Sequence, residues 1–237
     1  MKICCSSRSY ARALQSGDLT QLEWIDGCAG LALDGVDLAA AHFPRLDSDY
    51  LAQVRKLCAD RGLTVAAVCV DDPIGGDADV DASAKSIAAW IARADELGAP
   101  LLRLASGSAA GASAGIAWRE LIRGLKTIAA EAKAANVTLA LEQREGSLVA
   151  TPLDCKRALK ECDSAWLRVA RVLAGGDDGS PYDEAVLAIA RGGDGDADVV
   201  GSLRARGFIG FVTIETAAAD EDSTVRAALS RLRAVRA

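Results

Sequence analysis

Aromatic residues make up only 4% of this chain of 237 residues, so few rings are present to stack on the bases of single-stranded nucleic acid. Basic residues do not dominate either, because the formal net charge is −6 and the isoelectric point lies near 4.9. Binding to a phosphate backbone needs a concentrated basic face. The composition therefore argues against a nucleic-acid partner.

Long apolar runs are also missing, since none approaches the roughly 20 residues of a membrane-spanning helix. The segment from Met1 to Ser7 carries one basic residue and lacks the apolar core of a secretory signal. Seven cysteines are present, an odd number, and none shows Cys-x-x-Cys spacing. We therefore expect no membrane partner, a cytoplasmic location and buried free thiols.

What the chain does contain is an alternation of short β-branched runs with Ala- and Leu-rich stretches at helical spacing. Eight such units of about 30 residues each are typical of repeated strand-helix pairs. The sequence predicts an α/β fold, a single (β/α)₈ TIM barrel spanning residues 1–237. The expected strands are Lys2 to Ser6, Gly35 to Leu38, Leu63 to Val70, Leu101 to Leu104, Thr138 to Glu142, Leu167 to Leu173, Ala185 to Ala190 and Ile209 to Glu215.

Three helices have clear boundaries in the sequence. One follows the capping residue Asp47 and ends at Gly62, and the next ends before Gly98. A third opens at Thr151-Pro152, which supplies a hydroxyl cap and a proline in the first turn.

Two stretches interrupt the alternation. Residues 106–115 form a Gly-, Ala- and Ser-rich loop after the fourth strand, and residues 175–183 replace most of the helix expected after the sixth strand. Helix six is therefore predicted to be missing or shortened, with that wall exposed or covered by a second subunit in a homodimer. Neither stretch has the glycine spacing of a nucleotide-binding loop.

Two glutamates each close a predicted strand, Glu142 the fifth and Glu215 the eighth. Side chains alternate along a strand, and the apolar Leu139 and Leu141 suit the helix-facing side, so Glu142 is expected to point inward. The same pattern turns Glu215 inward. Barrel chemistry occurs at the carboxyl ends of the strands, so both glutamates are candidates for one site. The alternative is that each is a solvated strand-end charge.

Several arginines are candidates for this site. Arg103, in the fourth strand, should point inward, where it could pair with the glutamates or hold an anionic substrate group. Arg168, Arg171 and Arg191 lie in or beside the sixth and seventh strands, and alternation lets only one of Arg168 and Arg171 face inward. A rim charge is the alternative for each.

His42 is the only histidine and lies just beyond the second strand, where it could act as an acid, a base or a substrate contact. A structural role is the alternative. Asp37, at the end of the second strand, and Glu145, close behind Glu142, are weaker candidates.

Four segments carry a resemblance that covers essentially the whole chain. They are Leu97 to Gly107, Val137 to Gln143, Thr151 to Asp154 and Arg206 to Glu215. In their order and spacing the chain resembles the sugar phosphate isomerase/epimerase superfamily, the xylose isomerase-like TIM barrels that include endonuclease IV.

The resemblance implies a divalent metal such as Mn²⁺, Mg²⁺, Co²⁺ or Zn²⁺, held by Glu, Asp, His and Glu from strands five to eight. Glu142 and Glu215 match the first and last of these ligands. The segments Leu167 to Gly175 and Ala188 to Arg191 lack the Asp and the His. Two carboxylates alone make a poor site, so we expect no cofactor or a weakly bound metal, with arginine neutralising the glutamates.

Three functions follow from this resemblance. In the first, a sugar or sugar-phosphate isomerase or epimerase, Glu142 and Glu215 exchange a proton beside a carbonyl, and Arg103, His42 and Arg191 bind the substrate. The alternative is a non-catalytic barrel that binds a small sugar, an anionic ligand or a protein partner. An endonuclease acting on abasic DNA is disfavoured by the acidic composition.

Overall fold

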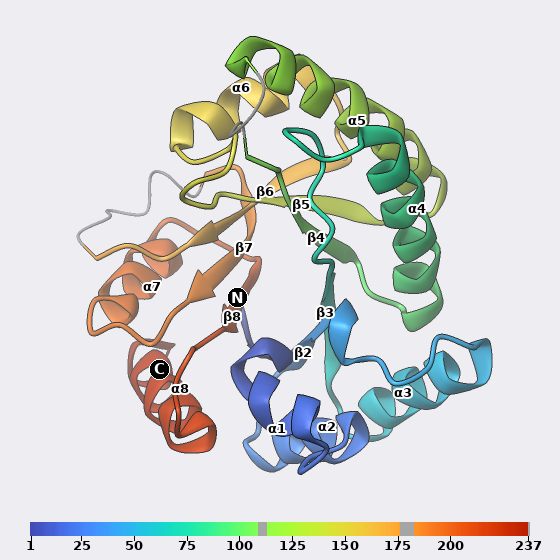
Figure 1. Ribbon diagram of the computed structural model, residues 1–237. Helices are drawn as coiled ribbons and strands as arrows, with labels where there is room; N and C mark the ends of the chain where they lie inside the picture. Colours follow the sequence, from blue (N-terminus) through green and yellow to red (C-terminus); the bar gives the residue numbers. More distant parts are fainter. Residues whose placement is uncertain (109–112, 176–182, 237) are drawn as a thin grey trace. The chain divides into compact units, whose positions relative to one another are not determined.

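Eight parallel strands form a closed barrel in the order β1 to β8, which confirms the predicted α/β barrel (Figure 1). The computed structural model describes residues 1–108, 113–175 and 183–236. The strands are β1 (Lys2–Ser6), β2 (Gly35–Ala39), β3 (Thr64–Cys69), β4 (Leu101–Ala105), β5 (Thr138–Glu142), β6 (Leu167–Val172), β7 (Ala185–Ala190) and β8 (Phe211–Ile214). The helices are α1 (Ala11–Ser16), α2 (Gln21–Gly30), α3 (Ser48–Asp60), α4 (Val80–Leu97), α5 (Ala114–Ala134), α6 (Pro152–Cys162), α7 (Asp196–Ala205) and α8 (Glu221–Arg236), with short 3₁₀ turns η1 (Ser7–Tyr10) and η2 (Ala40–His42).

The strand boundaries match the predictions for β1, β5 and β7 and differ at the ends of the others. The largest difference is in β8, which begins at Phe211 rather than Ile209. Ile209 is 90% exposed, so it does not join the buried run that follows. Glu215 lies one residue beyond β8, although its N–H still donates to the carbonyl oxygen of Ala190 over 2.9 Å.

The predicted helix boundaries have clear local causes. The Asp47 side chain accepts a hydrogen bond from the Tyr50 N–H at the start of α3, and Thr151 forms a reciprocal capping box with Asp154 at the start of α6. Helix α4 ends at Gly98, which adopts the left-handed conformation at φ 71°. These three helices are confirmed.

The two interrupting stretches are described only in part. Residues 173–175 and 183–184 contain no helix, while 176–182, which carry most of the prediction about helix six, lie outside the described residues. The loop after β4 is shorter than predicted. Ser113 caps α5 by accepting a hydrogen bond from the Ile116 N–H, so the helix begins at Ala114; residues 109–112 are outside the described range.

Contacts divide the chain into two compact units, Met1–Ala66 with Arg171–Ala237, and Ala67–Ala170. In the second unit, helices α4 and α5 lie side by side over β4 and β5 (Figure 1). On these helices Ile87, Ile91 and Leu121 are at most 2% exposed. In the first unit, β1 pairs with both β2 and β8.

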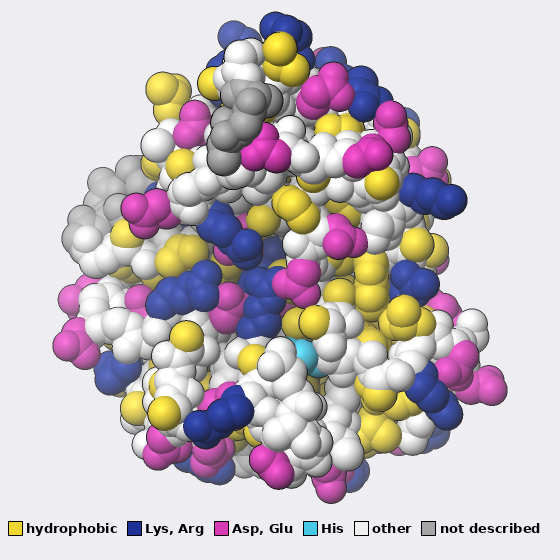
Figure 2. All heavy atoms as spheres, in the orientation of Figure 1, with side chains coloured by type: hydrophobic (Ala, Val, Ile, Leu, Met, Phe, Trp, Pro, Cys, Tyr) yellow, Lys and Arg dark blue, Asp and Glu magenta, His cyan; other side chains and the backbone are white. Residues whose placement is uncertain are grey.

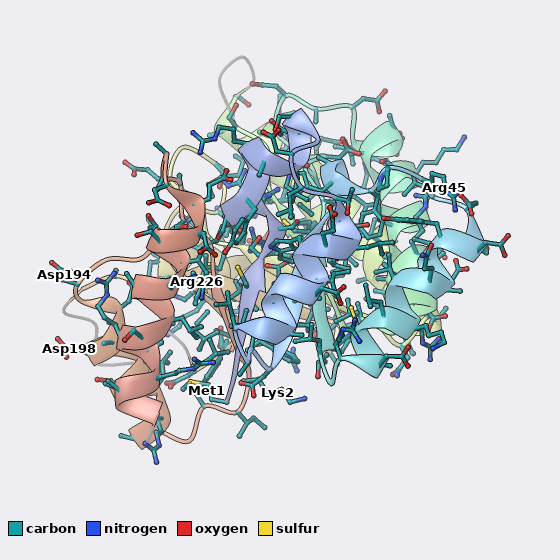
Figure 3. All side chains as sticks on the ribbon, turned by 90° about the horizontal axis from the view of Figure 1, so that it is seen from below. Met1, Lys2, Arg45, Asp194, Asp198 and Arg226 are labelled. Atoms are coloured by element: carbon teal, nitrogen blue, oxygen red, sulfur yellow. The ribbon has the colours of Figure 1, made fainter. Side chains whose placement is uncertain are left out.

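The surface of the first unit is charged, and its interior holds thiols. Met1 and Lys2 lie at the amino end of β1, while Asp194, just before α7, and Asp198, within α7, project outward (Figure 3). All seven cysteines of the chain are free and buried, as predicted. Burial raises the pKa of the Cys58 thiol to about 12, which is the behaviour of an unreactive core residue.

Acidic and basic side chains are interspersed over α4 and α5 on the face seen in Figure 2. Within the described residues, no helix is both long and apolar enough to cross a membrane.

Candidate functional site

The candidate site of the second unit is centred on the buried carboxylate of Glu142. In the register of β4 and β5, Arg103 lies beside Ala140 and Ala105 beside Glu142. Because side chains two residues apart share a face of the sheet, Arg103 and Glu142 point to the same side. Both are enclosed, with side-chain exposures of 0% and 1%. The sequence expectation that they share a face is met.

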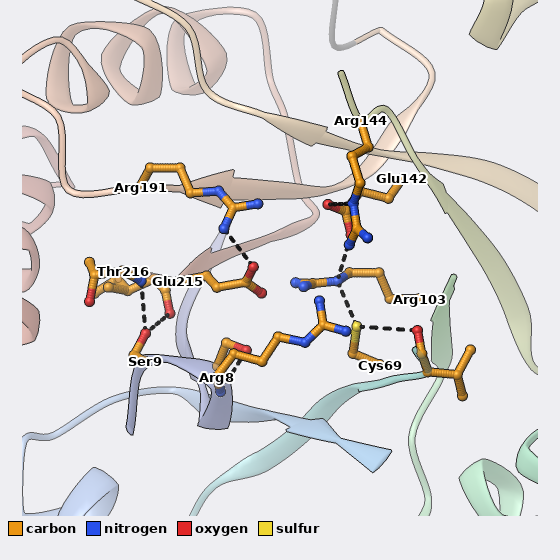
Figure 4. Close-up of polar contacts among 12 residues, drawn as sticks. Arg8, Ser9, Cys69, Arg103, Glu142, Arg144, Arg191, Glu215 and Thr216 are labelled. Atoms are coloured by element: carbon orange, nitrogen blue, oxygen red, sulfur yellow. Dashed lines mark hydrogen bonds and ion pairs between the residues drawn. The ribbon is translucent and has the colours of Figure 1, made fainter. Parts of the chain in front are cut away.

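Arg103 bridges the glutamate and a thiol. Its Nε lies 3.4 Å from Glu142 Oε2 and donates to Cys69 Sγ over 3.1 Å (Figure 4). The guanidinium therefore places a fixed positive charge beside a carboxylate that has almost no contact with water. Burial costs a carboxylate several kcal/mol of hydration free energy, and the attraction of this guanidinium offsets that loss.

A second arginine, Arg144, holds the same carboxylate, and sequence reasoning missed it. Its Nε donates to Glu142 Oε1 over 3.3 Å and its Nη2 to Glu142 Oε2 over 3.2 Å, so it contacts both oxygens. Unlike Arg103, this side chain is 44% exposed. Glu142 is thus neutralised by one buried and one half-exposed guanidinium.

The turn after β5 places Arg144. The Arg144 N–H donates to the carbonyl oxygen of Val149 over 3.0 Å, Ser147 Oγ donates to the Arg144 carbonyl over 2.8 Å, and Gly146 takes the left-handed conformation at φ 79°. The turn directs the chain back on itself two residues after the strand. The signal in the sequence was an arginine two positions after a strand-end glutamate and before a glycine.

Glu215 defines the corresponding site of the first unit. The Glu215 residue is 4% exposed, and Arg191 Nη1 donates to its Oε1 over 2.7 Å (Figure 4). The Arg191 side chain is 44% exposed. It follows the last residue of β7, and β7 and β8 are paired in register, so the contact joins the carboxyl ends of neighbouring strands.

The turn that carries Arg191 is fixed by a buried carboxylate. Asp196 Oδ2 accepts hydrogen bonds from the N–H groups of Gly192 and Gly193, over 2.8 and 3.1 Å. Burial raises the pKa of Asp196, and these backbone hydrogen bonds oppose the rise. Arg231 also donates to the Gly192 carbonyl, over 2.7 Å. Arg191 therefore extends from a well-supported turn.

The single histidine is bound to its own unit. His42 Nδ1 lies 2.9 Å from Ser7 Oγ, which also accepts a hydrogen bond from the Ala39 N–H. This arrangement links η2 to η1 and fits the structural alternative for His42. Of the weaker candidates, Asp37 is fully buried and Glu145 is exposed.

The register settles the choice between the two arginines of β6. Arg168 pairs with Ala140, so it lies on the face that Arg103 and Glu142 share. Arg171 is three residues further along the strand, so alternation turns it to the opposite face. Arg168 is half-buried, and its Nη1 donates to the carbonyl oxygen of Leu167 over 2.9 Å. The prediction that Glu142 and Glu215 share one site joins residues of different units and stays a prediction.

The donor set around Glu142 does not fit a divalent metal. Both carboxylate oxygens already accept guanidinium hydrogens, so a cation binding there would have to displace Arg144 and approach the charge of Arg103. Within residues 1–108, 113–175 and 183–236, no three or more His, Cys, Asp or Glu side chains gather in a group that could hold a metal. Metal sites of fixed geometry usually need three or four protein donors.

Comparison with known proteins identifies the architecture. A family model described as "Xylose isomerase-like TIM barrel" matches residues 25–170. No curated protein matches the sequence.

Solved structures of similar fold span nearly the full chain. A 3-keto-D-glucoside 4-epimerase from E. coli is 17% identical, with a TM-score of 0.80 and 99% of each chain covered. A D-psicose 3-epimerase from Clostridium cellulolyticum H10 is 16% identical, with a TM-score of 0.80 and coverage of 100% of this chain and 98% of that one. A probable 3-DHS dehydratase from Bacillus anthracis is 14% identical, with a TM-score of 0.80 and coverage of 98% and 99%. At these identities the likeness establishes the fold.

Proposed function

The chain belongs to the xylose isomerase-like TIM barrel family, and we propose that it binds a small anionic, sugar-like ligand at the carboxyl end of β5 without a divalent metal. The observation that carries this proposal is the position of Arg144. Two nitrogens of its guanidinium donate hydrogen bonds to the buried carboxylate of Glu142, while the Arg144 side chain remains 44% exposed.

A guanidinium held in this way is suited to binding a second anion. It carries five N–H donors in a plane, and the two bonds to Glu142 leave others directed elsewhere. The contact with Glu142 also fixes the orientation of the group before a ligand arrives, which reduces the conformational entropy lost on binding. A carboxylate or phosphate on a sugar-sized molecule is the matching partner.

Arg191 makes a similar contact in the other unit, where its half-exposed guanidinium donates a hydrogen bond to the buried carboxylate of Glu215. The same chemistry of recognition is therefore available at the carboxyl end of β7. We propose that each of these arginines contacts a ligand group within its own unit, and that Arg103, which is fully buried, serves to neutralise Glu142.

Isomerisation or epimerisation is the second candidate, favoured by the sugar epimerases among the structures of similar fold. In that reaction Glu142 and Glu215 would exchange a proton with the carbon beside a carbonyl. A general base needs an oxygen that can approach the substrate, whereas the Glu142 side chain is only 1% exposed and Arg144 covers it with two hydrogen bonds. Ligand binding is therefore the better-supported function.

The proposal is tested by calorimetric titration of the purified chain with D-gluconate, D-glucose 6-phosphate and D-glucose in the presence of EDTA. We expect saturable binding of an anionic sugar and weaker binding of neutral glucose. Replacing Arg144 with methionine should weaken anion binding by about tenfold, the effect of losing one charged hydrogen-bonding contact. Arg123→Met is the matched control, since Arg123 is 47% exposed and pairs with Glu120 and Asp81 on helices.

Three outcomes would overturn the proposal. They are failure of any anionic sugar to bind, equal weakening by Arg144→Met and Arg123→Met, and equal affinity for neutral and anionic sugars. Nuclear magnetic resonance of the same sugar mixtures reports epimer or isomer products. Turnover that persists in EDTA and is lost in Glu142→Gln would favour the second candidate.

A further inference from the structure

The loops after β3, β4 and β5 of the second unit meet around Ser106. Ile74, in the loop after β3, forms a parallel bridge with Ser106. In this bridge the Ile74 N–H donates to the Ala105 carbonyl over 3.0 Å, and the Gly107 N–H donates to the Ile74 carbonyl over 3.1 Å. On its other side, Ser106 Oγ accepts a hydrogen bond from the Val149 N–H over 3.0 Å. The serine therefore joins the turn after β5 to two other loops.

Val149 connects this serine with Arg144. The Val149 N–H donates to Ser106 Oγ, and the Val149 carbonyl accepts a hydrogen bond from the Arg144 N–H over 3.0 Å. Two consecutive hydrogen bonds thus lead from the Ser106 hydroxyl to the backbone of Arg144. The side chain that leaves this backbone donates to both carboxylate oxygens of Glu142 (Figure 4).

The contact between Ser106 and Val149 is shielded from water. The two residues are 4% and 0% exposed, so a backbone N–H that lost the serine oxygen would not gain a hydrogen bond from bulk solvent. Ser147 Oγ lies 3.3 Å from the same N–H, but Ser147 belongs to the turn itself and does not attach the turn to β4. Ser106 supplies that attachment through its side chain.

A backbone contact supports the same attachment. The Leu148 N–H donates to the Gly107 carbonyl over 2.8 Å. Removal of the Ser106 hydroxyl should therefore loosen the turn without releasing it. Because Ser106 is buried, it does not reach a ligand at Arg144, and its effect on binding is transmitted through the turn.

We propose that Ser106 is a positioning residue, which holds the turn after β5 so that the Arg144 guanidinium lies across Glu142 before a ligand binds. The inference rests on the proposed function, in which Arg144 contacts an anionic sugar. A group that is already oriented loses less conformational entropy on binding. Loss of the serine should therefore weaken the binding of an anionic sugar and leave that of a neutral sugar unchanged, because a neutral sugar offers no charge to the guanidinium.

Nuclear magnetic resonance of the full chain, labelled with nitrogen-15, tests the positioning without a ligand. The signal of the Arg144 Nε–H is identified by its absence from Arg144→Met, and its exchange with water is then measured in Ser106→Ala. We expect exchange about fivefold faster than in the wild-type chain, the effect of one lost hydrogen bond. Ser106→Cys, which retains a weak acceptor of similar size, should give an intermediate rate.

Ser164→Ala is the matched control, since Ser164 Oγ also accepts a hydrogen bond from a backbone N–H, that of Trp166, over 3.2 Å. This serine precedes β6 and therefore lies at the amino end of the strands. The change removes the same kind of contact from the same unit, so a general loss of stability would appear in both variants. We expect the exchange of the Arg144 Nε–H to be unchanged in Ser164→Ala.

Calorimetric titration with D-gluconate and D-glucose in EDTA measures the consequence for binding. Ser106→Ala should bind gluconate about fivefold more weakly than the wild-type chain, with unchanged affinity for glucose. Ser164→Ala should leave both affinities unchanged. Thermal melting establishes that each variant is folded.

The two measurements separate this inference from the proposed function. If the wild-type chain binds no anionic sugar, the proposed function fails, and the exchange of the Arg144 Nε–H still decides whether Ser106 positions the guanidinium. Equal exchange rates in the wild-type chain, Ser106→Ala and Ser106→Cys would overturn the inference. So would gluconate binding that is equally strong in the wild-type chain and in Ser106→Ala, or equally weakened by Ser106→Ala and Ser164→Ala.

Discussion

Arg103→Met is expected to lower the free energy of unfolding by about 3–5 kcal/mol, the effect of removing one partner from a buried ion pair. Arg103 and Glu142 are 0% and 1% exposed, and methionine offers neither charge nor hydrogen-bond donor to the carboxylate. Arg144 would remain, but its exposed position allows water to screen its attraction. The change is measured by urea denaturation followed by circular dichroism.

Lys56→Met serves as the control, because Lys56 forms an exposed pair with Asp60 on α3, with side chains 75% and 52% exposed. Such a pair should contribute less than about 1 kcal/mol. The double variant Arg103→Met with Glu142→Gln should recover part of the loss, since no uncompensated charge remains. A loss below about 1 kcal/mol for Arg103→Met, the range of an exposed pair, would contradict the role of Arg103 as the buried counter-charge.

Gly76→Ala is expected to destabilise the chain by about 3 kcal/mol or more, from strained backbone and overpacking together. Gly76 has a φ of 72°, and an added methyl group would overlap the Ser108 carbonyl oxygen and lie 2.9 Å from the Gly107 carbonyl carbon. Its loop is joined to the loop after β4 by a hydrogen bond from the Asp77 N–H to the Ser108 carbonyl, over 3.1 Å.

Gly146→Ala separates the two causes. Gly146 has a similar φ of 79°, and nothing lies within 4 Å of the position that its methyl group would take. This variant should show the conformational effect alone, about 1–2 kcal/mol. Urea denaturation of both variants measures the difference. Equal losses for the two would mean that the loops after β3 and β4 can separate without a penalty.

The barrel could be predicted from the sequence because its determinants are local. Strand alternation placed Arg103 and Glu142 on one face, and capping residues such as Asp47 and Thr151 marked the helix starts. These signals act within a few residues, so no knowledge of distant contacts was needed. The predicted start of β8 was less accurate. Isoleucine favours strands locally, but Ile209 is 90% exposed and lies outside the strand, which begins at Phe211.

The partners of the site residues were harder to predict. Arg144 reaches Glu142 only because a turn closed through Val149 directs the chain back, and the sequence carries no periodic signal for that contact. His42 is bound to Ser7, which lies 35 positions away, so its structural role depends on tertiary packing. Whether Glu142 and Glu215 act together stays a prediction.

The central claim is that arginine, rather than a divalent metal, neutralises Glu142. Thermal melting of the purified chain in EDTA and in excess Mn²⁺ tests it most directly, with Glu142→Gln melted in parallel. A metal ion that binds the folded chain, present at a free concentration 100 times its dissociation constant, would stabilise the fold by about 2.7 kcal/mol. We expect the same melting temperature in both conditions and a destabilised Glu142→Gln. A saturable rise in melting temperature with Mn²⁺ that disappears in Glu142→Gln would contradict the claim.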